Sequence, residues 1–114
     1  MISPEIMAAE PSSVAGVLIH ELTHARNMIN KFVEGANIGC YEDEDKAFEA
    51  TALYWADLYP NGKRPTTHWL DSQLNENLAQ YRAGTIDQRV RQEYGHQCGT
   101  SLAPADVFSL SPSQ

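Results

Sequence analysis

Apolar residues between Val14 and Phe32 recur at intervals of three and four positions, the spacing of one face of an α-helix. Ser12 or Ser13 can cap the start of such a helix, because a serine hydroxyl accepts from a free N–H of the first turn. The pattern therefore predicts a first helix from about Val14 to Val33, ending near Gly35. The apolar positions that carry it are Val14, Val17, Leu18, Leu22, Ala25, Ile29 and Phe32.

Two more helices are predicted in the middle of the chain. The acidic run Glu42–Asp45 can begin one of them, because negative charge is favoured beside the exposed N–H groups of a helix N-terminus. That helix should end near Leu58, before the turn residues 60–62 (Pro-Asn-Gly). A third helix is expected over 67–82, ended by Gly84. Its helical stripe consists of Leu70, Leu74, Leu78 and Tyr81.

A short fourth helix is predicted after Gly84. Thr85 and Gln88 have the spacing of a capping box at its start. Ile86, Val90 and Tyr94 would share one face, and Gly95 would close the helix.

These elements predict a mainly α fold, a small single domain over 1–114 with about four helices and little or no sheet. Residues 1–12 are expected to form an irregular arm, and the Ser- and Pro-rich residues 100–114 a loose tail. No segment has the pattern of a clear strand. Any strand would have to lie within 1–12 or 97–110.

Composition excludes some classes of protein. Hydrophobic residues make up 42% and charged residues 20%, which is typical of a globular domain. The formal net charge of −7 argues against a nucleic-acid partner and against an anionic membrane surface. No apolar run reaches the roughly 20 residues of a membrane helix.

The cellular compartment stays open. The N-terminus lacks the pattern of a signal peptide, which fits a cytoplasmic protein or an exported effector. Cys40 and Cys98 can form one disulfide or remain two free thiols, so they do not settle the compartment.

The segment His20–His24 reads His-Glu-Leu-Thr-His and lies within the first predicted helix. Residues four apart share a helix face, so both imidazoles can bind one zinc ion, with the glutamate beside the zinc-bound water. The apolar residues Val17–Ile19 predict that this helix is buried, where an unpaired glutamate would be costly without a metal. We therefore predict one Zn2+ per chain, with His20 and His24 as ligands and Glu21 as the catalytic residue.

The third zinc ligand distinguishes the classes of zincin peptidase. Metzincins have glycine and histidine where this chain has Asn27 and Asn30, which excludes that class. The chain resembles instead the gluzincins, thermolysin-like peptidases in which a glutamate of the following helix is the third ligand. The resemblance covers roughly residues 14–58 and implies Glu44, which lies about twenty residues beyond the second histidine, as that ligand.

Other carboxylates remain alternatives for the third ligand. Glu42 lies two residues earlier, and Glu49 lies about 140° around the helix from Glu44, so Glu44 and Glu49 cannot both face the ion. A weaker resemblance to the aspzincins, whose ligand is the aspartate of a Gly-Thr-x-Asp segment, makes Asp87 a further alternative. Here the following Tyr94–Gly95 lies four residues later than that pattern requires.

The residue that orients the first histidine is not evident. Gluzincins often have an aspartate four residues after the glutamate ligand, bonded to the first histidine, and this chain has Phe48 there. Asp45, Asp57 and Asn27 are candidates to replace it.

The resemblance implies a zinc-dependent metallopeptidase that acts on a peptide or protein substrate. Glu21 would take a proton from the zinc-activated water and pass it to the leaving amine. A hydrogen-bond donor would stabilise the oxyanion. The candidates are Tyr41, Tyr54, His68 and His96, and their spacing does not choose among them.

Two other functions fit the same residues. One is a catalytically inactive, zinc-stabilised helical module that binds a protein partner, and the other is a zinc hydrolase of a non-peptide amide. Glu21 favours an enzyme, because metal binding alone does not need it. Only substrate assays separate the two kinds of hydrolase.

Overall fold

The computed structural model describes residues 3–35 and 37–99, which contain five α-helices and no strand. The helices are α1 (Pro4–Met7), α2 (Pro11–Val33), α3 (Cys40–Leu58), α4 (Trp69–Ala83) and α5 (Ile86–Gly99). This confirms the mainly α, small single-domain fold without a sheet over the described part of the chain.

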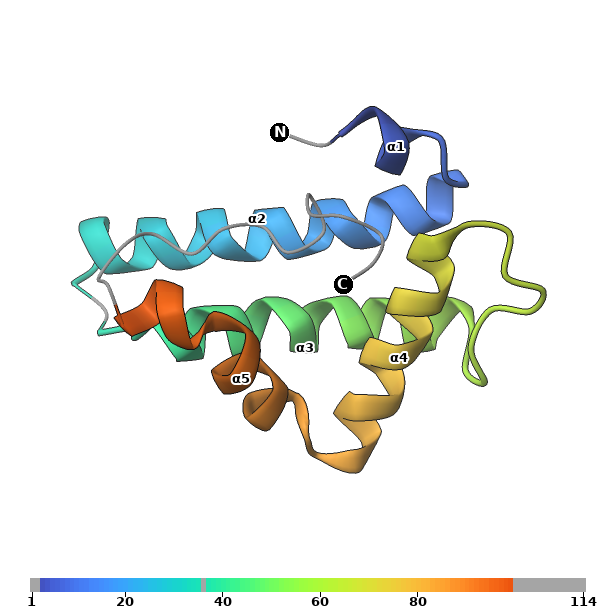
Figure 1. The fold of residues 1–114 in the computed structure, drawn as a ribbon. Helices are drawn as coiled ribbons and strands as arrows, with labels where there is room; N and C mark the ends of the chain where they lie inside the picture. Colours follow the sequence, from blue (N-terminus) through green and yellow to red (C-terminus); the bar gives the residue numbers. More distant parts are fainter. Residues whose placement is uncertain (1–2, 36, 100–114) are drawn as a thin grey trace.

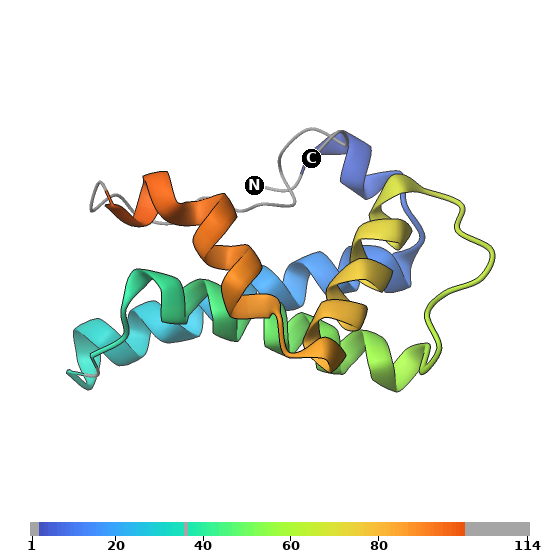
Figure 2. The same cartoon turned by 60° about the horizontal axis from the view of Figure 1, so that its bottom comes forward.

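The long helices α2 and α3 lie side by side and antiparallel, and α4 and α5 form a V against α3 (Figures 1 and 2). The apex of the V is Gly84, which adopts a left-handed conformation with φ 74° at the C-cap of α4. Glycine reaches this conformation without strain, so the chain can reverse there within a few residues. The V brings α5 back toward the start of α3.

The core lies between α3 and the V formed by α4 and α5. Trp55 and Phe48 of α3 are its largest buried side chains, and both are almost fully enclosed. Apolar residues of α4 and α5 complete it, among them Leu70, Leu74, Leu78, Val90 and Tyr94. This arrangement leaves most of the length of α2 outside the apolar core.

A buried ionic network fixes α2 and the α3–α4 loop to α4. The Asp71 carboxylate accepts from Ser13 Oγ at 2.6 Å, Lys63 Nζ at 2.9 Å and the Thr67 backbone N–H at 2.9 Å. These bonds outweigh the effect of burial, which alone would raise the pKa of Asp71, and they lower that pKa to about 2. The carboxylate is therefore charged and fully paired in the fold.

A disulfide joins Cys40, the first residue of α3, to Cys98 near the end of α5. It answers the question that the sequence left open between two free thiols and one bridge. The disulfide therefore joins the C-terminal end of α5 to the N-terminal end of α3.

Several predicted boundaries were wrong. The expected irregular arm contains α1, and α2 begins at Pro11 with Glu10 as its N-cap residue, so neither serine caps it. Thr85 Oγ1 donates to the Gln80 carbonyl and does not form a capping box. Helix α5 continues through Gly95 to Gly99, because packing and the disulfide override the low helix propensity of a single glycine. The predicted tail 100–114 lies outside the described residues.

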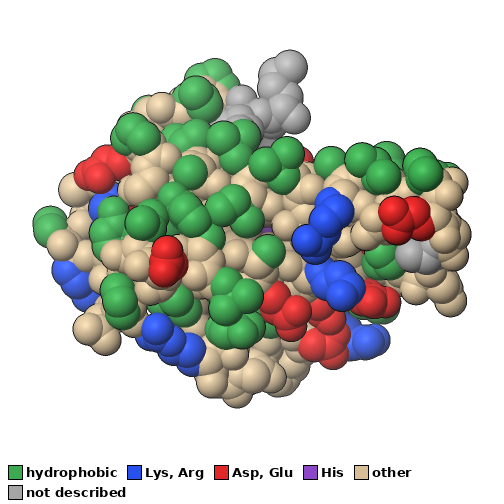
Figure 3. All heavy atoms as spheres, turned by 180° about the vertical axis from the view of Figure 1, so that it is seen from behind, with side chains coloured by type: hydrophobic (Ala, Val, Ile, Leu, Met, Phe, Trp, Pro, Cys, Tyr) green, Lys and Arg blue, Asp and Glu red, His purple; other side chains and the backbone are tan. Residues whose placement is uncertain are grey.

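Helix α2 is turned the other way from the prediction. Apart from Val17, most of its apolar stripe faces solvent (Figure 3). Leu22 is 65% and Phe32 76% exposed. Its buried face is small and polar, and consists of Ser13, Gly16, Val17, His20, Thr23 and Asn27. Gly16 allows this face of α2 to lie close to α4, because a Cβ at this position would be only 3.2 Å from a methyl carbon of Leu74.

The expectation that Val17–Ile19 bury this helix therefore holds only for Val17. His20 and His24 point inward for another reason, because they lie on the polar face that meets α3. Within the described residues, no helix has the length and apolar character needed to cross a membrane.

Candidate metal site

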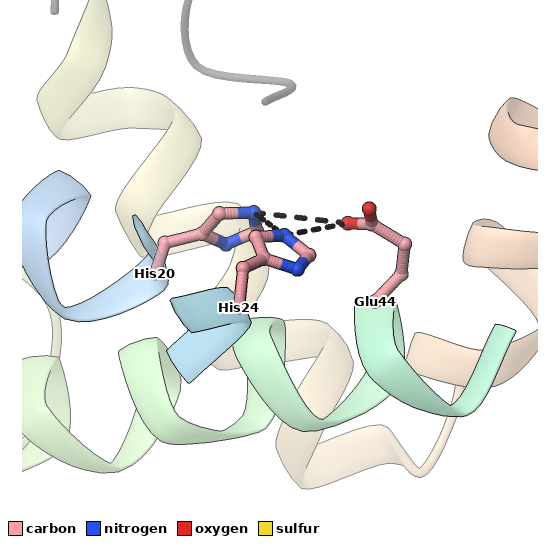
Figure 4. Close-up of side chains that lie close together, drawn as sticks. All are labelled: His20, His24 and Glu44. Carbon is pink, nitrogen blue, oxygen red and sulfur yellow. Dashed lines mark hydrogen bonds and ion pairs between the residues drawn. The ribbon is translucent and has the colours of Figure 1, made fainter. Parts of the chain in front are cut away.

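Helices α2 and α3 bring His20, His24 and Glu44 together (Figure 4). The histidines lie one turn apart on the inward face of α2, and Glu44 faces them from the second turn of α3. Among the described residues this is the group of His, Cys, Asp and Glu side chains whose spacing suits a metal ion.

The three potential ligand atoms have the spacing of a zinc site. The two histidine Nε2 atoms are 3.2 Å apart, and Glu44 Oε1 lies 3.4 Å from His24 Nε2 and 3.7 Å from His20 Nε2. A tetrahedral ion with bonds of 2.0–2.1 Å needs ligands about 3.3 Å apart. A circle through the three atoms has a radius of about 2.0 Å, so one ion can reach all three at zinc bond length. The residues therefore fit a zinc ion.

Burial keeps His20 neutral. Its side chain is fully enclosed, and its ring packs edge-on against the ring of Phe48 with centroids 4.5 Å apart. Burial first, and then the positive charges of His24 and Arg89, lower the pKa of His20 well below its usual value. A neutral imidazole is the form that binds a metal. Phe48, where the resemblance expected an aspartate, thus contacts the first histidine through its ring.

Asp43 orients His24. His24 Nδ1 donates to Asp43 Oδ2 at 2.8 Å, which leaves Nε2 to face the cluster. Asn27 Nδ2 donates to the other Asp43 oxygen at 2.7 Å and holds the carboxylate in place. Burial alone would lower the pKa of His24, but the hydrogen bonds to Asp43 and Glu44 raise it to about 10. A metal ion must therefore displace a proton from His24.

The sequence prediction missed Asp43. Of the three candidates for an orienting residue, only Asn27 takes part, and it acts on the second histidine through Asp43. The signal was present, because the run Glu42–Asp45 necessarily places neighbours of Glu44 near the motif. The sequence did not show which side of α3 faces α2.

Glu44 and Glu21 supply two carboxylates at or beside the cluster. Burial is the main cause that raises the pKa of Glu44, and the charges of Asp43 and Glu21 add to it, while His24 opposes it. Glu21 is partly buried beside His20, and its Oε1 is enclosed without a hydrogen-bond partner among the described residues. The charge of Glu21 is thus close enough to act on Glu44.

The rival ligands lie elsewhere. Glu42 is half exposed and pairs with Lys46 one turn later, and Glu49 is exposed on α3. Asp87 is exposed at the start of α5, where it accepts from Arg91 Nε at 2.9 Å.

The candidates for oxyanion donor have other roles. Tyr54 donates to the Ser12 carbonyl at 2.9 Å. His68 is the N-cap residue of α4, and its ring bonds the backbone of two other residues. The ring of Tyr41 lies under a guanidinium of α5, and His96 is exposed. Tyr94, which the sequence placed only on an apolar helix face, is buried. Its pKa is raised first by burial and then by nearby negative charges that include Glu44 and Glu21.

Comparisons with protein-family models, curated proteins and solved structures found no match for this chain.

Proposed function

We propose that this chain is a zinc-dependent metallopeptidase of the gluzincin type. The observation that carries the proposal is the spacing of the His20, His24 and Glu44 ligand atoms, which fits one ion at zinc bond length. Glu21 next to this cluster supports an enzyme rather than a purely structural ion.

A zinc ion held there would supply Lewis acidity, which activates a water molecule and polarises a carbonyl oxygen. Glu21 would take the proton from the attacking water and return it to the amine that leaves when the peptide bond breaks. Asp43 would hold the His24 ring in place throughout, and Glu44 would offset positive charge.

The partly exposed residues suggest how a substrate enters. His24 retains 16% of its side-chain surface and Glu21 is partly exposed, whereas His20 and Glu44 are fully buried. A substrate would therefore approach from the side of α2 that carries Glu21 and His24. Zinc peptidases often hold an extended substrate beside a strand, and the described residues offer no strand for this.

The test is metal analysis of the wild type and Glu21→Ala, with cleavage of a peptide library by both. We expect about one zinc per chain in both proteins and cleavage by the wild type alone. A wild type without zinc would overturn the metal site, and equal cleavage would remove Glu21 from the mechanism. A panel of non-peptide amides in the same assay identifies the alternative hydrolase.

The exposed apolar stripe of α2 favours a second candidate function, a zinc-stabilised module that binds a protein partner. Exposed apolar patches commonly mark protein interfaces. This candidate predicts zinc binding in both proteins and cleavage by neither.

A further inference from the structure

Tyr94 on α5 has a buried hydroxyl group. The residue is 3% exposed, and Tyr94 Oη has no hydrogen-bond partner among the described residues. A buried hydroxyl normally bonds to something, since leaving it unpaired loses its interaction with water. The Tyr94 hydroxyl is therefore available to a bound ligand.

The disulfide holds the turn of α5 that carries Tyr94 near the turn of α3 that carries Glu44. Cys40 lies one turn before Glu44 on α3, and Cys98 lies one turn after Tyr94 on α5. Residues four apart share a helix face. Because the Cα atoms of the two cysteines are 5.4 Å apart, the next turn inward brings Glu44 and Tyr94 toward each other.

Ring packing links Tyr94 to His20 through Phe48. The Tyr94 ring lies edge-on to Phe48 with centroids 6.2 Å apart, and Phe48 in turn packs on His20. Burial is the largest cause that raises the pKa of Tyr94, followed by the charge of Glu44, and Glu21 adds to the effect. The hydroxyl therefore remains protonated at neutral pH and can only donate to an anionic group near it.

We infer that Tyr94 Oη donates a hydrogen bond to the exogenous ligand at the open position of the metal site, a small anion or the carbonyl oxygen of a substrate. The inference rests on the proposed metal site. In catalysis the bond would strengthen as negative charge develops on the carbonyl oxygen, which makes Tyr94 a ligand-binding residue of the reaction.

The experiment uses the full chain loaded with Co2+, whose visible absorption reports ligands at the metal, and titrates it with azide. The test variant is Tyr94→Phe, which keeps the ring that packs on Phe48 and removes only the hydroxyl. Tyr81→Phe, the same change at a half-exposed residue of α4, is the control. We expect azide to bind Tyr94→Phe about 10- to 100-fold more weakly than wild type, as for the loss of a hydrogen bond to a charged group.

The affinity for Co2+ and the melting temperature of Tyr94→Phe should match those of wild type and the control. Unchanged azide affinity would overturn the inference. A large loss of Co2+ affinity would also overturn it, because the hydroxyl would then serve a protein ligand such as Glu44. Cobalt-loaded wild type that binds no azide would likewise contradict the inference, whereas wild type that binds no Co2+ contradicts the metal site itself.

Discussion

Different forces hold the two sides of the cluster at the scale of single residues. His24 is held by a charged hydrogen bond to Asp43, while His20 is held by burial against the ring of Phe48. Both interactions fix the histidine rings before a metal binds, which reduces the conformational entropy lost on metal binding. They also predict different consequences of substitution.

Glu44→Gln should weaken zinc binding by about 100-fold or more, because it removes a charged ligand at nearly constant volume. Residues that only hydrogen-bond to metal ligands already contribute about 10- to 100-fold to metal affinity. Glu42→Gln and Glu49→Gln are the matched controls on α3, and both should stay within about threefold of wild type. Competition with a chromophoric chelator at constant pH measures the affinities. The opposite order would move the third ligand to another glutamate.

Asp43→Asn should reduce zinc affinity by about tenfold, because the amide can still accept from His24 Nδ1 but no longer carries the charge that orients and polarises the ring. Asp57→Asn is the control, since Asp57 is exposed near the other end of the same helix. The same chelator competition applies. Equal affinity in both variants would show that Asp43 has no role in the site.

The sequence predicted the residues that meet at the cluster, but not those behind them. Helical periodicity places His20 and His24 on one face, and the spacing in the resemblance selected Glu44. Asp43 and Tyr94 were missed because their roles depend on how α3 and α5 are rotated. No pattern within one helix contains that information.

At the scale of elements, α2 shows that a strong apolar stripe does not reveal which face is buried. The 3–4 spacing correctly predicted the helix, yet the face that packs on α3 and α4 carries glycine, serine and the two histidines of the candidate metal site. A small-residue face allows a closer approach than the leucine face would, as Gly16 does against Leu74 of α4. Its buried polar groups bond to both neighbouring helices, Ser13 to Asp71 of α4 and Asn27 to Asp43 of α3. The stripe is then left for solvent or a partner.

Leu22→Ala should change the free energy of unfolding by no more than about 0.5 kcal/mol, because Leu22 already faces solvent. Leu74→Ala is the matched truncation in α4, where the same side chain is fully buried against α2. It should cost about 2–5 kcal/mol. Urea unfolding followed by circular dichroism gives both values. A large loss in Leu22→Ala would mean that this face is covered in solution.

At the scale of the whole molecule, contacts between distant residues decide what the local pattern cannot. The number and order of the main helices followed from periodicity and from Gly84, while the length of α5 followed from a disulfide to residue 40. The Asp71 network likewise joins residues 58 positions apart in sequence. Such contacts between residues distant in the sequence cannot be predicted from a single sequence.

The Asp71 network predicts a loss of stability in acid. The pKa of Asp71 is about 2 in the fold and 3.8 ordinarily, so the carboxylate stabilises the fold above about pH 4 and stops doing so as the pH falls through 2. The contribution is about 2 kcal/mol. Urea unfolding at pH 5 and pH 2 should therefore show a smaller pH-dependent loss in Asp71→Asn than in wild type, and equal losses would contradict the prediction.

The double substitution Cys40→Ser with Cys98→Ser should cost roughly 4 kcal/mol in free energy of unfolding, because the bridge spans a sequence separation of 58 and removes the entropy of that loop from the unfolded chain. Urea unfolding without reductant measures the loss. Dithiothreitol should destabilise wild type by a similar amount and leave the double variant unchanged, which separates the effect of the bond from that of the serine side chains.

The same double variant should also bind zinc more weakly, because the cysteines lie one turn from Glu44 and Tyr94. Excess zinc should restore part of its stability, because zinc would bind only the folded state. Loss of stability with unchanged zinc affinity would show that the α2–α3 pair alone shapes the site.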